Sequence, residues 1–194
     1  MCSVQRTEND LLEECRRGNR AAFQELVEKY QRRIVSLALG MVHNPDDAME
    51  IAQETFVKAY ENIGNFKGES SVYTWLYRIA VNKAIDFRRR QRRQSTVSFD
   101  NPRPEHEGQT FEETLQEERP FGPDQRAQAQ QVGERVAEAI DELTPDHKAV
   151  ILLREVEGLS YEEISRVMHC SKGTVMSRLH YARKRLQKKL RDLA

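Results

Sequence analysis

The stretch SYEEISRVMHCSKGTVMSRLHYARKR (residues 160–185) determines how the C-terminal third of this chain folds. Ser160, followed three residues later by Glu163, is the pattern of a capping box that starts a helix. His169-Cys170-Ser171 then form a turn, and Ser171 can cap a longer, basic helix. A short helix, a three-residue turn and a basic second helix have the dimensions of a helix-turn-helix. The sequence therefore predicts this DNA-binding motif near the C-terminus.

The second helix of the motif carries the candidate DNA contacts. A recognition helix enters the major groove by its N-terminal part, while later cations suit phosphates. We expect Val175 and Leu179 to face inward and anchor this helix. The candidate contacts are Lys172, Thr174, Met176, Ser177, Arg178, Tyr181 and Arg183. An ordinary helical hairpin with a solvated basic face is the alternative, and the paired caps favour DNA binding.

Charge is distributed unevenly, although the whole chain has 31 basic and 31 acidic residues. Residues 83–93 (KAIDFRRRQRR) carry a net charge of +5, and residues 172–194 carry +7. Residues 94–127 between them carry −5. Two basic stretches separated by an acidic one indicate two contacts with a polyanion.

The rest of the chain also reads as helix. Apolar residues recur every three or four positions from Asn9 to Arg93, with breaks at Gly18-Asn19 and at Asn44-Pro45 and a loop over residues 62–71. Residues 94–127 combine prolines with acids and little apolar periodicity, which is typical of a linker. We predict an all-α protein with two helical domains, residues 1–93 and 128–194, joined by the acidic flexible linker 94–127, with the helix-turn-helix in the second domain.

Several function classes are disfavoured by the sequence. No run approaches the roughly 18 apolar residues of a membrane span, and the first ten residues lack the apolar stretch of a secretion signal. We therefore expect a cytoplasmic protein, whose three cysteines, Cys2, Cys15 and Cys170, are free thiols at no metal-ligand spacing. A glycine-rich phosphate loop and a nucleophile elbow are both lacking, so we predict no enzyme, no catalytic residue, no cofactor and no metal.

A second candidate nucleic-acid site lies between Phe66 and Arg93. Phe66, Tyr73, Trp75, Tyr77 and Phe87 lie in and beside a helix that becomes strongly basic. Aromatic rings can stack on unpaired bases while cations contact the backbone, which suits single-stranded DNA. Core packing is the alternative; we favour it for Trp75 and Ile79, and it remains open for the loop residues and Asn82.

Three segments resemble the extracytoplasmic-function sigma factors, a compact branch of the housekeeping-type bacterial sigma family. They are DDAMEIAQETFVKAY (46–60), FKGESSVYTWLYRIAVNKA (66–84) and LREVEGLSYEEISRVMHCSKGTVMSRLHYARKRL (153–186). The resemblance implies an RNA polymerase sigma factor that directs promoter recognition and transcription initiation. It covers both expected domains in order, and only the linker lies outside it.

The resemblance also implies partners and site residues. The first domain would bind the clamp helices of the polymerase largest subunit, and the second would dock on the polymerase flap and read the minus-thirty-five element through the contacts named above. An anti-sigma protein would hold the factor inactive, and its target genes would belong to a stress or envelope response. No stable homo-oligomer is expected. The implied core-polymerase contacts are Asp47, Glu50, Gln53 and Glu54. The implied minus-ten DNA contacts are Phe66, Lys67, Gly68, Glu69, Ser70, Tyr73, Asn82, Arg88, Arg89 and Arg90.

Two departures bear on specificity, and one other function competes. Met176 and His180 stand where some relatives have Arg and an aromatic residue, so no promoter consensus is transferred to this chain. The competing hypothesis is a helix-turn-helix regulator that acts without being a polymerase subunit. Such regulators usually dimerise on palindromic sites, and no dimerisation helix is evident.

Overall fold

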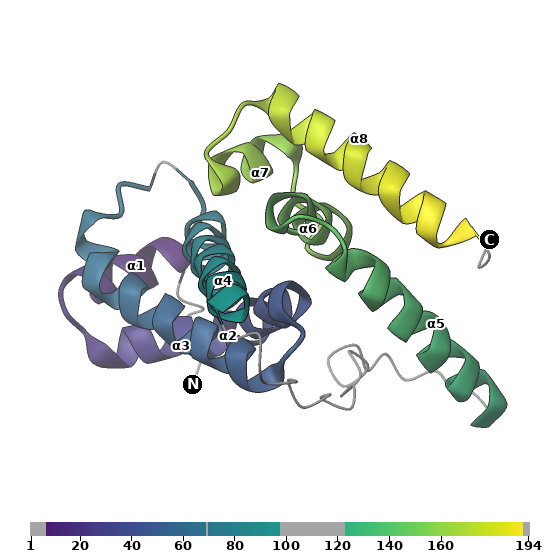
Figure 1. Ribbon diagram of the computed structural model, residues 1–194. Coiled ribbons are helices and arrows are strands. Elements are labelled where there is room, and N and C mark those ends of the chain that lie inside the picture. The colour runs from purple at the N-terminus through teal and green to yellow at the C-terminus, as the bar shows by residue number, and fades with distance from the viewer. Residues whose placement is uncertain (1–6, 69, 98–122, 192–194) are drawn as a thin grey trace.

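The computed structural model describes residues 7–68, 70–97 and 123–191, and every regular element in these ranges is a helix. This confirms the predicted all-α class. The N-terminal half contains α1 (Glu8–Arg16), α2 (Arg20–Val42), α3 (Pro45–Asn62), the short η1 (Ile63–Asn65) and α4 (Val72–Val97). The C-terminal half contains α5 (Pro123–Asp141), α6 (Pro145–Ile151), η3 (Leu152–Val156), α7 (Tyr161–Met168) and α8 (Lys172–Lys189) (Figure 1).

Helices begin at the breaks and caps that the sequence indicated. Asn19 and Asn44 accept backbone N–H bonds at the starts of α2 and α3. Ser160 forms the expected capping box with Glu163, and Ser171 accepts the N–H of Thr174 at the start of α8. Thr144 precedes α6, but its hydroxyl contacts His147 Nδ1 at 2.6 Å and caps no backbone group.

The described helices extend into the predicted linker from both sides. Helix α4 continues to Val97, beyond the expected boundary at Arg93, and α5 begins at Pro123, before the expected start at residue 128. Proline suits the first turn of a helix because its missing N–H has no helical partner there. The remaining linker residues, 98–122, lie outside the described part of the chain.

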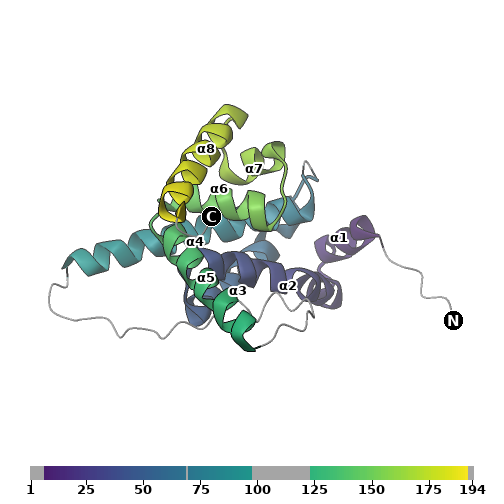
Figure 2. The same cartoon turned by 90° about the vertical axis from the view of Figure 1, so that its right-hand side faces the viewer.

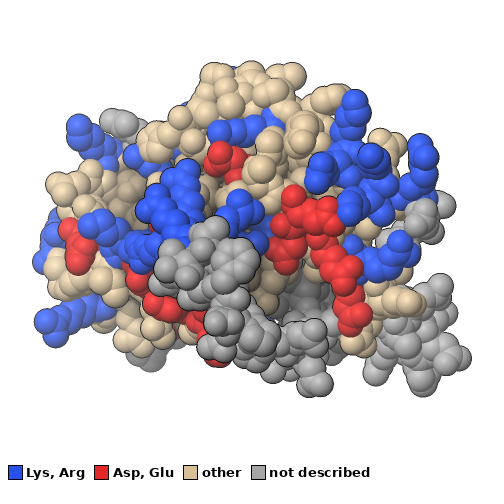
Figure 3. All heavy atoms as spheres, in the orientation of Figure 1, with Lys and Arg blue, Asp and Glu red and all other residues tan. Residues whose placement is uncertain are grey.

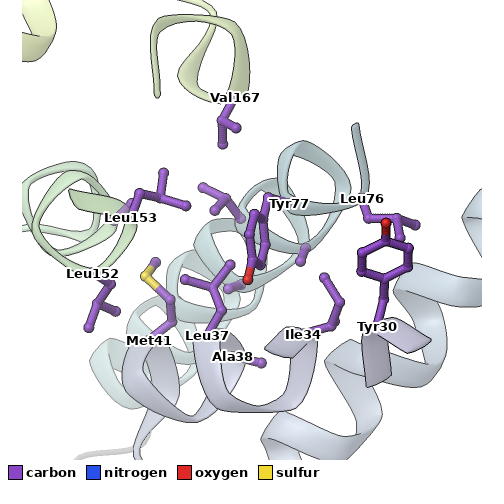
Figure 4. Close-up of a cluster of buried hydrophobic side chains, with 14 of the residues drawn as sticks. Tyr30, Ile34, Leu37, Ala38, Met41, Leu76, Tyr77, Leu152, Leu153 and Val167 are labelled. Carbon is purple, nitrogen blue, oxygen red and sulfur yellow. The ribbon is translucent and has the colours of Figure 1, made fainter. Parts of the chain in front are cut away.

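The two halves share one hydrophobic core. Helices α6 and α7 pack on α4, and η3 packs on α2. Leu152 and Leu153 of η3 and Val167 of α7 lie in the same cluster as Met41 of α2 and Tyr77 of α4 (Figure 4). The sequence predicted two separate domains, and these residues come from both of them. The structure instead buries Leu153 and Tyr77, both 0% exposed, at the junction between the halves.

Gly40 allows a close approach across this junction. A Cβ atom at residue 40 would lie 3.0 Å from Leu152 Cδ1, and its three nearest neighbours would all be atoms of Leu152. Glycine inside a helix costs roughly 0.5–1 kcal/mol relative to alanine. The missing side chain thus permits contact between α2 and η3 at the expense of helix propensity.

Asp141 gathers two cationic side chains and a histidine beside this contact. Its Oδ1 accepts from Lys148 Nζ at 2.5 Å and from Arg88 at 3.2 Å, and it lies 3.5 Å from His43 Nε2. Lys148 Nζ also donates to the Met41 carbonyl at 3.3 Å. Because burial disfavours its charged form, the pKa of Lys148 falls to about 8, although Asp141 opposes the shift. A carboxylate of the C-terminal half therefore joins cations from both halves.

His43 is held neutral within this cluster. Burial lowers its pKa to about 4, the charges of Lys148 and Arg88 add to the shift, and Asp141 counteracts it. Its Nε2 makes no hydrogen bond within the described ranges. His43 also ends α2 in a left-handed conformation, with φ of 56°.

Acidification should therefore weaken the fold through His43. Between pH of about 6.5 and 4 the unfolded chain binds more protons at this position than the folded one, so stability falls as pH drops through that window. The variant His43→Asn cannot titrate, and asparagine tolerates the left-handed backbone. Urea unfolding followed by circular dichroism at several pH values should show a smaller loss for the variant than for the wild type. Parallel pH profiles of the two proteins would contradict this assignment.

Candidate nucleic-acid interface

One exposed row of polar residues runs along α4. Arg78, Asn82, Asp86 and Arg89 are all exposed and follow one another at intervals of three or four residues. At about 3.6 residues per turn, such residues lie on one side of a helix. The predicted residues Asn82 and Arg89 therefore share a face, while Arg78 belongs to that face without having been predicted. Its position four residues before Asn82 was the signal that could have identified it.

The basic end of α4 projects beyond the other helices (Figure 2). Arg89 and Arg90 are exposed there, with Arg89 at 3.8 Å from the carboxylate of Asp86. Arg88 differs, because it turns back to Asp141 and is only 21% exposed. Of the three predicted arginines, Arg89 and Arg90 are therefore accessible and Arg88 is engaged by the C-terminal half.

The structure places the ring of Phe66 in the core rather than at the surface. The residue is 7% exposed, and its ring lies 5.0 Å from that of Trp75. Its carbonyl oxygen accepts a bond from Arg16, and the Arg16 guanidinium lies 5.9 Å from the Phe66 ring. A ring enclosed in this way is not free to stack on a base. Composition had left core packing open for the loop residues, and the minus-ten role of Phe66 was implied by the family resemblance.

The neighbouring loop positions are more accessible. Lys67 and Gly68 are exposed, and Gly68 has φ of 75°, which glycine adopts without strain. Ser70 is half-buried, and Glu69 lies outside the described residues. The accessible part of the predicted minus-ten loop is therefore Lys67 and Gly68.

The C-terminal half contacts Tyr73 of α4. Its hydroxyl donates to the Glu157 carbonyl at 3.2 Å, and its ring packs edge-on against Tyr77 at 4.2 Å. The Arg33 guanidinium covers another side of the ring at 5.4 Å. The Tyr77 hydroxyl donates to the Glu157 carboxylate, and burial raises the pKa of that carboxyl. Tyr73 is thus engaged within the protein and does not offer a free ring.

The predicted polymerase contacts lie along α3. Glu50 and Gln53 are exposed, whereas Asp47 and Glu54 are half-buried. Lys83 of α4 donates to Glu54 at 2.6 Å. Asp47, Glu50 and Glu54 line a shallow hollow between α3 and α4 that Arg90 also borders. The structure therefore brings an acidic face and a predicted DNA contact to the same groove.

Sequence reasoning missed the apolar part of the α3 surface. Met49, Val57 and Tyr60 are among the exposed large hydrophobic residues, and Val57 is 60% exposed. Tyr60 lies edge-on against Phe23 of α2, with ring centroids 5.0 Å apart. Exposed apolar side chains beside acids suit a protein partner better than DNA. These apolar residues interrupt the charged pattern on the outer face of α3, and that interruption could have identified the apolar surface from the sequence.

Carboxylates of the C-terminal half form ion pairs with cations on the sides of α8. Arg178 lies 3.2 Å from Asp146, and Arg183 lies 2.7 Å from Glu155. Lys172 pairs with Glu162. Exposed pairs contribute little to stability, so Lys172 and Arg183, each at least half exposed, can exchange a carboxylate for a phosphate at small cost. Arg178 is only 25% exposed and is the most constrained of the three.

The outer face of α8 lies opposite the buried residues of this helix. Val175, Leu179 and Ala182 are buried, as predicted for the first two, so the line through Gly173, Ser177, His180 and Lys184 points away from the body. Met176 and Tyr181 flank this line and are at least half exposed. The remaining predicted contact, Thr174, is half-buried and bonds to the Ser171 hydroxyl at the helix start.

Lys and Arg gather in two groups on one face of the molecule. One group lies over the end of α4 and the other along α8, with Asp and Glu between them where α5 runs (Figure 3). The folded chain therefore preserves the two basic stretches of the sequence as separate surfaces.

The described residues contain neither a metal-binding cluster nor a helix that could cross a membrane. Within residues 7–68, 70–97 and 123–191, no group of His, Cys, Asp and Glu could hold a metal ion. Cys15 is a buried free thiol whose pKa is raised by burial, and Cys170 is a half-buried free thiol. Among the described helices, none combines the length and apolar character needed to cross a bilayer.

Comparisons with known proteins match both halves of this chain. Residues 26–94 match the family described as Sigma-70 region 2, and residues 133–186 match Sigma-70, region 4. The RNA polymerase sigma-H factor of Pseudomonas aeruginosa is 38% identical over 98% of this chain and 97% of its own length. The ECF RNA polymerase sigma-E factor of Escherichia coli K12 is 36% identical over 98% of both chains.

Two solved structures share the fold. CnrH in complex with the cytosolic domain of CnrY has a TM-score of 0.67 and 23% identity, covering 95% of this chain and 97% of that one. The sigma factor RpoE bound to the anti-sigma factor NepR, from Bartonella quintana, has a TM-score of 0.64 and 24% identity, covering 87% and 96%. At this identity the similarity concerns the fold alone.

The burial of Phe66 leads to a stability prediction. Replacing Phe66 by Ala should reduce the free energy of unfolding by about 3–5 kcal/mol, because a buried phenyl ring leaves a cavity. The adjacent exposed Lys67→Ala is the matched control and should change it by less than about 0.5 kcal/mol. Urea unfolding measures both. A fully stable Phe66→Ala protein would show that this ring is not part of the core.

Proposed function

This chain belongs to the sigma-70 family of RNA polymerase sigma factors, in its extracytoplasmic-function branch, and we propose how its surfaces divide the task of promoter recognition. The protein is a sigma factor of RNA polymerase and directs transcription initiation. Sigma factors are initiation factors rather than enzymes. The observation that carries the proposal is the presence of two separate basic surfaces, on α4 and α8, within the two matched regions.

Helix α3 would bind core RNA polymerase. Glu50 and Gln53 with the exposed Val57 and Tyr60 combine charge with apolar area, as protein interfaces do. The proposed partner on this face is the pair of clamp helices of the polymerase largest subunit. The C-terminal domain, residues 128–194, would dock separately on the polymerase flap, with the acidic linker 94–127 passing between the two sites.

Helix α4 would bind the minus-ten element as a single strand. Its row from Arg78 to Arg89 offers cations to the backbone and the Asn82 amide to a base. Lys67 and Gly68 lie in the loop that would receive a flipped base. Extruding a base costs a few kcal/mol, which such contacts would offset.

Helix α8 would read the minus-thirty-five element in the major groove. Ser177 and His180 on its outer line, flanked by Met176 and Tyr181, would face base edges. Lys184 and Arg183 would contact phosphates. This assignment gives Arg178 a smaller role in base reading than sequence alone suggested.

Control by an anti-sigma protein is part of the proposal. The acidic and apolar face of α3 would be exposed in the free factor and would suit a protein that competes with polymerase. We further propose that the factor acts in the cytoplasm, as a monomer, on genes of a stress or envelope response.

The primary test is transcription by purified core RNA polymerase on fragments of the native genome, with and without this protein, followed by sequencing of RNA 5′ ends. We expect discrete starts that appear only with the protein and share two spaced upstream elements. A helix-turn-helix regulator would instead bind specific duplex without polymerase and would create no new starts with core enzyme alone.

Substitutions on the two DNA surfaces should have separable effects. Asn82→Ala should impair promoter opening, read by permanganate reactivity of unpaired thymines, while leaving affinity for core polymerase unchanged. Ser177→Ala should weaken upstream recognition by about 1–3 kcal/mol if its hydroxyl reads a base, with opening of pre-melted templates unaffected. Equal loss of core binding in both variants would refute this division.

A further inference from the structure

Helix α1 contacts the backbone at the start of the loop that precedes α4. Arg16, in the last turn of α1, donates from its guanidinium to the carbonyl oxygen of Phe66, 50 residues away along the chain. The same guanidinium lies 5.9 Å from the centroid of the Phe66 ring. A charged donor makes a stronger hydrogen bond than a neutral one, and a cation is attracted to the face of an aromatic ring. Arg16 therefore holds both the main chain and the ring of Phe66.

The position of Arg16 is determined by other contacts of α1. Cys15, the preceding residue, is 3% exposed and packs in the hydrophobic core. Glu13 pairs with the Arg16 guanidinium at 2.5 Å. At the start of α1, the Glu8 carboxylate accepts a hydrogen bond from Lys29 of α2 at 3.1 Å. The helix is thus fixed at both ends, and the Arg16 side chain is only 29% exposed.

The contact with Phe66 sets the direction of the backbone that follows. Because a peptide group is planar, fixing the Phe66 carbonyl also fixes the N–H of Lys67. Gly68 then continues the chain in a left-handed conformation, with φ of 75°. On the C-terminal side of the loop, the Ser71 hydroxyl accepts the N–H of Thr74 at 3.1 Å, at the start of α4. The accessible residues Lys67 and Gly68 therefore lie between two fixed points of the backbone.

We propose that Arg16 is a positioning residue for promoter opening, which presets the loop around Lys67 and Gly68 to receive a flipped base. The inference rests on the proposed function of this loop. Arg16 acts through the Phe66 carbonyl and need not touch DNA itself. A loop that already has its bound conformation avoids the cost of ordering, so more of its contact energy offsets extrusion of the base.

A purely structural role for Arg16 predicts a different pattern of losses. If Arg16 only stabilised the fold, its removal would lower the stability of the protein, its binding to core polymerase and its binding to DNA together. If Arg16 positions the loop, recognition of one base should suffer, while folding and core binding stay unchanged. Measuring DNA binding base by base therefore separates the two roles.

Three variants make this measurement specific. Arg16→Ala removes both the hydrogen bond and the cation from Phe66. Arg17→Ala is the matched control, because it removes an identical side chain at the next position, which is exposed. Arg16→Lys is the conservative variant, since it keeps a cation and a hydrogen-bond donor at the same position.

The experiment uses holoenzyme assembled from core RNA polymerase and the full chain. The probe is a single-stranded oligonucleotide with the minus-ten element shared by the mapped starts, in which each base in turn is replaced by an abasic site. For the wild type and Arg17→Ala, one abasic position should weaken binding by about tenfold, because the loop loses its base. For Arg16→Ala the intact strand should bind less tightly, and the loss at that position should fall below about threefold. Arg16→Lys should lie between the two.

The outcomes separate this inference from the proposed function. An undiminished abasic loss in Arg16→Ala would overturn the positioning role, while the flipped-base function of the loop would stand. Equal losses at every position, with a lower urea midpoint or weaker core binding, would also overturn it, because Arg16 would then be a structural residue. If the wild type had no abasic-sensitive position, the flipped-base function itself would be wrong, and the inference would fall with it.

Discussion

The junction at which η3 contacts α2 and α6 and α7 contact α4 is the constraint on which the rest of this structure depends. Leu152 fits against Gly40, and the buried Tyr77 finds its hydrogen-bond partner in Glu157 of the opposite half. A buried hydroxyl without a partner would cost about 1–3 kcal/mol, so Tyr77 and Glu157 fix how the halves meet. The positions of α4 and α8 relative to each other follow from this one junction.

The electrostatic design of the molecule separates stability from binding. Lys148 and Asp141 are joined at the junction, where Asp141 offsets part of the cost of burying the lysine charge, whereas Lys172 and Arg183 make exposed pairs on α8. Exposed pairs are weak and screened by salt, so phosphates can replace their carboxylates. The same residue types thus serve packing in one place and nucleic-acid binding in the other, according to their burial.

Local features were predictable because they depend on neighbouring residues. The caps at Asn19, Ser160 and Ser171, and the buried positions Val175 and Leu179, are as the sequence indicated. Aromatic composition alone left open whether Phe66 is a stacking ring or a core ring, and the family resemblance implied its role at minus-ten DNA. Its burial follows from Trp75 and Arg16, and Arg16 lies 50 residues away along the chain.

The sequence by itself determined the all-α class, the two basic stretches and the helix-turn-helix, since periodicity, caps and charge runs are properties of short segments. Only the tertiary structure decided that Tyr73 and Arg88 meet Glu157 and Asp141, that Arg178 is held by Asp146, and that α4 extends to Val97. Most of these facts join residues more than thirty positions apart. Such pairings depend on how whole helices pack, which no local pattern encodes.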